Sequence, residues 1–243
     1  ELEKIVAKND IGVIKMEVSR NEGPKNKFLE KVRKLATKKG IVLIFDECTS
    51  GFRECFGGIH SKFNVVPDLA MYGKAMGNGY AITAVVGKRD VMEYAQTTFI
   101  SSTFWTERIG PTAALKTLEV MQKTESWKYI SEKGLLIKKK WQEIADKHNL
   151  EINISGISPL PIFNFNYDRK LEYKTYITQE MLKKGFLAAN SVYLCTAHDD
   201  AIIDEYIHEL DGIFLKIKEC EEGIDIFELL DGPVCHDGFS RLN

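Results

Sequence analysis

The beginning of the chain alternates between apolar runs and one amphipathic segment. Residues 12–18 (Gly-Val-Ile-Lys-Met-Glu-Val) predict a short buried strand, and residues 41–45 form an apolar run typical of a parallel strand covered on both faces. Between them, a turn ends in Pro24, which suits the first turn of a helix, and Gly40 predicts the end of that helix. Apolar residues recur there at helical spacing: Phe28, Leu29, Val32, Leu35 and Ala36. This order of strand, helix and strand predicts a βαβ unit.

Further apolar segments extend the pattern to about residue 125. Residues 65–71 lead into the pair Gly73-Lys74, residues 82–86 predict another short strand, and Pro111 predicts the start of a helix. We therefore expect residues 1–125 to form an α/β region with a mostly parallel sheet and helices.

The pattern changes near residue 130, and we assign residues 126–243 to a small α+β domain. The expected elements are helices at 134–148 and 174–184, strands at 151–155, 160–167 and 187–194, and a long last helix. Asp199 or Asp200 is expected to cap that last helix. Its predicted inward residues are Ile202, Ile203, Tyr206, Leu210 and Phe214. The tail beyond Gly223 is expected to be an irregular arm.

The composition argues against two classes of partner. The chain has 243 residues, of which 44% are hydrophobic and 28% are charged, as is typical of a globular protein. Lys and Arg (33) nearly balance Asp and Glu (35), so no strong field would attract nucleic acid or an anionic membrane. The longest apolar runs are also too short to span a bilayer. We therefore expect no nucleic-acid partner and no membrane association.

The cysteines and the first residues favour a cytoplasmic location. The five cysteines are widely spread and none form a CxxC pair, which argues against a disulfide framework and against a structural zinc site, and we expect no metal. The first residues are charged and show no signal-peptide pattern. Because the chain starts with Glu rather than Met, we expect a processed product or a domain cut from a longer protein.

Three segments combine into candidate chemistry. Asp46, followed by Glu47, stands at the carboxyl end of a predicted strand, where open α/β sheets bind ligands. Lys74 has glycines around it (Gly73 and Gly77), which let backbone and a flat ligand approach closely. In a pyridoxal-phosphate site, a lysine holds the cofactor aldehyde and a carboxylate pairs with the pyridine nitrogen. The hydroxyls of Ser102 and Thr103 suit the phosphate group of such a cofactor.

Each of these residues alone has a simpler interpretation. A lysine among glycines is usually a solvated loop residue, and an Asp-Glu pair after a strand is more often a turn or a cap. Cys48 is by default a small apolar residue in a packed turn. The run ending in Asp46 also matches the Walker B strand of an ATPase, but the sequence has no GxxxxGK[ST] loop. A further alternative is a non-catalytic, truncated remnant that keeps the fold of an enzyme.

Longer motifs resemble the class III aminotransferases. Residues 41–53 (IVLIFDECTSGFR) resemble the strand and DEVxTGFR segment of that family. Residues 66–80 (VPDLAMYGKAMGNGY) are similar to the segment that carries its Schiff-base lysine. Residues 102–111 (STFWTERIGP) resemble the stretch that places a threonine on the cofactor phosphate of the partner subunit. Within that family, the sequence most resembles the glutamate-1-semialdehyde 2,1-aminomutase-like branch.

This resemblance implies the fold of the type I pyridoxal-phosphate transferases. Residues 1–125 would be the C-terminal part of the cofactor-binding large domain, and residues 126–243 the small C-terminal domain with an irregular tail. It also implies pyridoxal 5'-phosphate as the cofactor, a small amino or keto/aldehyde substrate, and a homodimer with active sites at its interface. The family's N-terminal region, which supplies a phosphate loop and an aromatic stacked on the ring, is absent from the sequence.

The same resemblance implies roles for individual residues. Lys74 would form the Schiff base and carry a proton, and Asp46 would bind the pyridine nitrogen. Cys48 takes the place of a valine that packs against the ring, and Thr49 stands where a polar residue can reach the ring hydroxyl. Thr103 would reach the phosphate across the dimer.

Two points stay open. Glu17 matches a glutamate of the family on the preceding strand, without an assigned role. Transamination between two substrates and an internal shift of an amino group on one molecule are both compatible with the motifs.

Overall fold

The computed structural model describes residues 1–101 and 103–238. The chain forms two compact units, one comprising Glu1–Lys128 and the other starting at Tyr129. The division therefore falls inside one helix, α5 (Ser126–Lys147).

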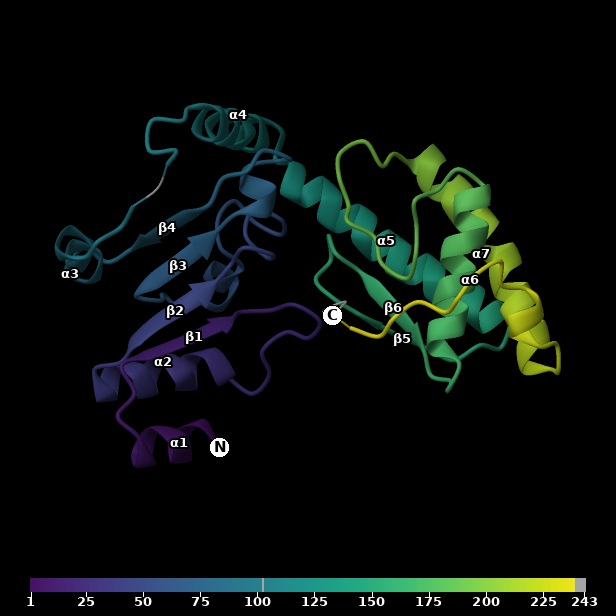
Figure 1. Cartoon of the computed structure of the whole chain (residues 1–243), viewed down its shortest axis with the longest axis horizontal. Coiled ribbons are helices and arrows are strands. Elements are labelled where there is room, and N and C mark those ends of the chain that lie inside the picture. The colour runs from purple at the N-terminus through teal and green to yellow at the C-terminus, as the bar shows by residue number, and fades with distance from the viewer. Residues whose placement is uncertain (102, 239–243) are drawn as a thin grey trace. The chain divides into compact units, whose positions relative to one another are not determined.

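A four-stranded sheet forms the centre of the first unit. Its strands lie side by side in sequence order, as Figure 1 shows. They are β1 (Val13–Glu17), β2 (Val42–Asp46), β3 (Leu69–Tyr72) and β4 (Ala84–Gly87). The first three are parallel, and β4 is antiparallel to β3. The predicted βαβ unit and the mostly parallel sheet are thus confirmed.

The two faces of this sheet are covered to different degrees. In β2, Leu43 and Phe45 point to one face and are fully buried. Val42, Ile44 and Asp46 point to the other face and are only partly buried. The prediction that this strand is covered on both faces is therefore met on one face only within the described chain. We call the second face, which carries Asp46, the open face.

The connection between β1 and β2 is the helix α2 (Phe28–Lys39). It ends where predicted because Gly40 adopts the left-handed region (φ 67°), and the N–H of Ile41 donates to the carbonyl of Ala36 (2.9 Å). The start of the helix was predicted wrongly. The helix begins at Phe28, after residues 26 and 27 in left-handed conformations, so Pro24 lies outside its first turn.

The remaining elements of the first unit are short, apart from α4. They are α1 (Leu2–Lys8), α3 (Arg89–Met92), α4 (Ile109–Thr124) and the 3-10 turns η1 (Ile59–Phe63), η2 (Lys74–Met76) and η3 (Glu93–Thr97). Pro111 lies in the first turn of α4, as its missing N–H allows.

The second unit packs helices on a two-stranded antiparallel sheet. The sheet pairs β5 (Ile152–Ser155) with β6 (Ile162–Phe165), and the other elements are α6 (Lys170–Lys183), α7 (Asp200–Glu221) and the turn η4 (Ile226–Glu228). Asp199 caps α7 by accepting a hydrogen bond from the N–H of Ile202 (2.9 Å). Trp141, Phe163 and Phe214 are fully buried in its core.

Two predictions for this unit were wrong. Residues 187–194 form no strand; a single bridge joins Ser191 to Ile162. The N–H groups of Val192 and Leu194 donate to the carbonyls of Pro161 and Pro159, and a proline has no N–H to donate in return, so a regular ladder cannot form. Ile202, predicted to point inward on α7, is exposed.

Candidate cofactor site

Asp46 is the last residue of β2, at the carboxyl end of the parallel strands. Its Oδ1 accepts a hydrogen bond from the N–H of Cys48 (3.1 Å), and its Oδ2 lies 3.1 Å from the ammonium of Lys15 on β1. Partial burial acts to raise the pKa of Asp46, but the Cys48 hydrogen bond and the Lys15 charge outweigh it and lower this pKa below its usual value. The carboxylate is therefore ionised at neutral pH.

Lys74 follows β3, the strand next to β2, after a single residue, Gly73, and begins the turn η2. Its Nζ donates a hydrogen bond to Oγ1 of Thr49 (2.7 Å), which joins the loops that follow the two strands. Lys74 has φ 45°, in the left-handed region that non-glycine residues rarely adopt. Such conformations concentrate at functional sites, where the surrounding structure holds them.

The thiol of Cys48 lies near enough to the Asp46 carboxylate and to Lys74 to be influenced by both charges. Burial and the neighbouring Asp46 carboxylate raise the pKa of its thiol, so the side chain is neutral. A Cβ atom on Gly73 would lie 3.7 Å from the sulfur of Cys48 and 3.3 Å from Cγ2 of Thr83, so there is little room for a side chain there. The structure thus brings together Asp46, Cys48, Thr49 and Lys74 at the ends of two adjacent strands.

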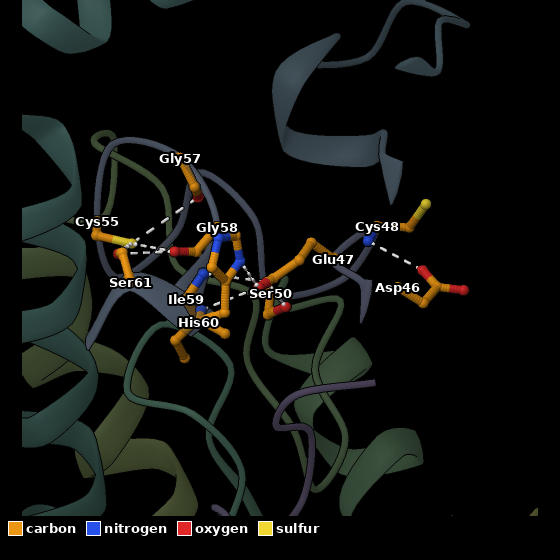
Figure 2. A network of polar contacts seen from close by, with 10 residues as sticks. All are labelled: Asp46, Glu47, Cys48, Ser50, Cys55, Gly57, Gly58, Ile59, His60 and Ser61. Carbon is orange, nitrogen blue, oxygen red and sulfur yellow. Dashed lines mark hydrogen bonds and ion pairs between the residues drawn. The ribbon is translucent and has the colours of Figure 1, made fainter. Parts of the chain in front are cut away.

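Glu47 points away from Asp46, toward the loop that follows (Figure 2). Its side chain is fully buried and accepts hydrogen bonds from the N–H groups of Ile59 (3.1 Å) and His60 (3.0 Å). Nδ1 of His60 and the hydroxyl of Ser50 also contact the carboxylate. Burial acts to raise the pKa of Glu47, but its hydrogen-bond partners, His60 first, lower it overall.

This network was not predicted, because His60 lies 13 residues beyond Glu47 in a loop that has no regular pattern. It holds both ends of the loop that starts with Cys48 and Thr49. Glu47 therefore fixes the backbone from which the two candidate site residues project.

The predicted phosphate-binding hydroxyl of Thr103 is not brought to this group. Thr103 is exposed, and no described contact joins it to Asp46 or Lys74. Ser102 lies outside the described residues.

The residues present fit pyridoxal phosphate. An ionised carboxylate and a lysine amine stand at the ends of adjacent parallel strands, and this matches a ring whose nitrogen and aldehyde lie on opposite sides. Within the described ranges, no cluster of three His, Cys, Asp or Glu side chains has the geometry to hold a metal ion.

The sequence matches the family model of the class III aminotransferases over residues 5–217. The chain therefore belongs to the class III aminotransferase family. This membership agrees with the resemblance seen in the motifs and rejects the ATPase alternative.

Two relatives show how much of the family's length is present. The chain is 37% identical over 202 residues to the 3-aminobutyryl-CoA aminotransferase of Cloacimonas acidaminovorans, covering 81% of this chain and 49% of that protein. It is 31% identical over 208 residues to the glutamate-1-semialdehyde 2,1-aminomutase of Methanocaldococcus jannaschii, covering 79% of this chain and 49% of that protein. The chain thus spans about half the length of these relatives.

Solved structures show the same fold. The FumI protein of Sphingopyxis sp. MTA144, solved in its PLP internal aldimine form, superposes with a TM-score of 0.83 at 22% identity. The match covers 92% of this chain and 56% of FumI. An omega-transaminase from Sphaerobacter thermophilus matches with a TM-score of 0.73 at 20% identity, over 82% of this chain and 50% of that one. The predicted type I fold is confirmed.

In the part of the chain that the structure describes, no helix combines the length and the apolar character needed to cross a bilayer.

Proposed function

We propose that this protein takes part in pyridoxal-phosphate-dependent transfer of an amino group, with Lys74 as the residue that binds the cofactor covalently. The observation that carries the proposal is the contact between Lys74 and Thr49 next to the ionised Asp46, at the ends of two adjacent strands. Membership of the class III aminotransferases supports the same chemistry.

When bound, pyridoxal phosphate supplies an electron-withdrawing ring that stabilises negative charge on the substrate carbon next to the amino group. Asp46 would hold the ring nitrogen through Oδ2, and Cys48 would pack its neutral thiol against the ring. Thr49, whose hydroxyl accepts a hydrogen bond from Lys74 (2.7 Å), would reach the ring hydroxyl. The Nζ of Lys74 would take a proton from the substrate carbon and return it to the cofactor carbon.

The remaining parts of the site are proposals about the assembled protein. The hydroxyls of Ser102 and Thr103 would contact the phosphate of the partner subunit in a homodimer. The exposure of Thr103 leaves its hydroxyl available for such a contact. The first unit would be part of the large cofactor-binding domain, the second the small domain, and the location would be the cytoplasm.

The substrate would be a small amino compound together with a ketone or aldehyde. The first relative above is an aminotransferase, which favours transfer between two molecules. Several relatives at about 30% identity are aminomutases, which keeps an internal amino shift as the second candidate. Incubation with a single amino aldehyde separates them, because only an aminomutase rearranges it without a second substrate.

Covalent labelling tests the central assignment. We expect pyridoxal phosphate, after borohydride reduction and peptide mass spectrometry, to be attached to Lys74. Lys74→Ala should lose this label and lower the rate of amino transfer by about 10²–10⁴-fold. Lys88→Ala is the matched control, because Lys88 is also a paired, half-exposed lysine but lies outside the site. A label spread over surface lysines and unchanged in Lys74→Ala would contradict the proposal.

A further inference from the structure

A cation from the neighbouring strand lies beside Asp46. Lys15, on β1, places its Nζ 3.1 Å from Oδ2 of Asp46. Parallel pairing of β1 with β2 sets Lys15 opposite Ile44 and Glu17 opposite Asp46, so all of these side chains lie on the open face of the sheet.

Both oxygens of the Asp46 carboxylate therefore have a partner. Oδ1 accepts from the N–H of Cys48, a backbone contact fixed by the turn that follows β2. Oδ2 is bound only to a side chain in the described contacts, and this side chain can move. A ring nitrogen that approaches Asp46 must take Oδ2 from Lys15 or share it.

We propose that Lys15 competes with the cofactor's ring nitrogen for Oδ2 of Asp46. Lys15 keeps the carboxylate paired before the cofactor binds. Because the cofactor must displace Lys15, the presence of Lys15 weakens cofactor binding. The inference rests on the proposed function, since it assumes that Asp46 faces the ring.

The exposure of the two side chains fits a reversible contact. The Lys15 side chain is 53% exposed and that of Asp46 is 21% exposed, so water can solvate the ammonium once it leaves. Glu17 lies two residues further along the same face of β1 and offers the displaced ammonium another carboxylate. An ion pair of this exposure is weak, and a ligand can break it.

Substitution of Lys15 gives the main test. Equilibrium dialysis of the whole protein with pyridoxal phosphate should show that Lys15→Met binds about two- to five-fold more tightly than wild type, as loss of one exposed ion pair predicts. Lys15→Arg keeps the competing charge and should bind as wild type does. Lys88→Met removes an equivalent charge, next to Asp68 instead of Asp46, and should leave the affinity unchanged. This variant controls for the loss of one positive charge from a protein that binds an anionic cofactor.

A second readout needs no cofactor. Carbon-detected NMR titration of the Asp46 carboxyl should show a higher pKa in Lys15→Met than in wild type, and no change in Lys88→Met. An unmoved Asp46 pKa, or a cofactor affinity that does not rise in Lys15→Met, would overturn the inference.

The failure of the inference can be told apart from the failure of the proposed function. If the wild type attaches the cofactor at Lys74 but Lys15→Met shows neither a higher affinity nor a higher Asp46 pKa, the inference alone fails. If the wild type attaches no cofactor at Lys74, the proposed function fails and the inference with it.

Discussion

The two units of the chain differ in how completely they bury their apolar residues. The second unit encloses a single aromatic centre, in which the rings of Trp141 and Phe163 lie 4.7 Å apart between centroids and those of Phe163 and Phe214 lie 5.6 Å apart. The first unit buries Leu43 and Phe45 on one face of its sheet. Its outer strands keep apolar side chains exposed to solvent: Val13 on β1 is 52% exposed and Val85 on β4 is 47% exposed.

The candidate site lies in the less enclosed unit. Asp46 and the neighbouring Lys15 are on the open face of the sheet, and Lys74 is exposed. Cofactor sites need access, whereas a packed core stabilises the fold without it. The comparison therefore teaches that the second unit depends on a packed aromatic core, whereas the first leaves one sheet face accessible next to the candidate site.

The largest effect is expected in the core of the second unit. Trp141→Ala should lower the free energy of unfolding by about 3–5 kcal/mol, because it removes a fully buried ring and leaves the hydroxyl of Tyr206 without the indole N–H that donates to it (3.0 Å). Urea denaturation followed by circular dichroism measures this. A loss below about 1 kcal/mol would contradict the view that this unit relies on its own core.

A smaller effect, dependent on pH, is expected in the first unit. Asp68 accepts hydrogen bonds from Arg33 on α2 (2.8 Å), Lys88 (2.7 Å) and the N–H of Leu43 on β2 (2.8 Å). Burial acts to raise the pKa of Asp68, but these three donors lower it to about 2. Asp68→Asn should lower the free energy of unfolding at neutral pH by about 2–3 kcal/mol, because charged hydrogen bonds are lost.

The sign of the pH dependence follows from this lowered pKa. The stabilisation from Asp68 is complete above the unfolded value of about 4 and is lost as the pH falls toward about 2. Wild type and Asp68→Asn should therefore differ most in urea midpoint at neutral pH and converge in acid. A constant difference between them across this range would show that the carboxylate charge is not the source of the stabilisation.

The smallest effect is expected on the open strand β4. Val85→Thr should change the free energy of unfolding by no more than about 0.5 kcal/mol, because the side chain is nearly half exposed and threonine keeps the β-branched shape. The same urea measurement applies. A loss comparable to that of Trp141→Ala would mean that this face is covered in solution, and the contrast between the units would then disappear.

The sequence predicted the parts that depend on local pattern. The apolar run before Asp46 and the helix ended by Gly40 follow from spacing alone, and the motif around Lys74 led to the family. Residues 187–194 were mistaken for a strand because their apolar character says nothing of the prolines opposite.

Two features of the site could not be predicted because they depend on contacts between distant segments. The approach of Lys15 to Asp46 is set by the register of β1 against β2. The contact of Glu47 with His60 depends on the path of an irregular loop. The roles of Ser102 and Thr103 stay predictions.

A crystal structure of the protein with pyridoxal phosphate tests the central claim most directly. We predict continuous density from Nζ of Lys74 to the cofactor, with the ring nitrogen within hydrogen-bond distance of Oδ2 of Asp46 and Lys15 moved away from that oxygen. A cofactor bound elsewhere, or a ring nitrogen facing away from Asp46 while Lys74 stays bonded to Thr49, would contradict the account.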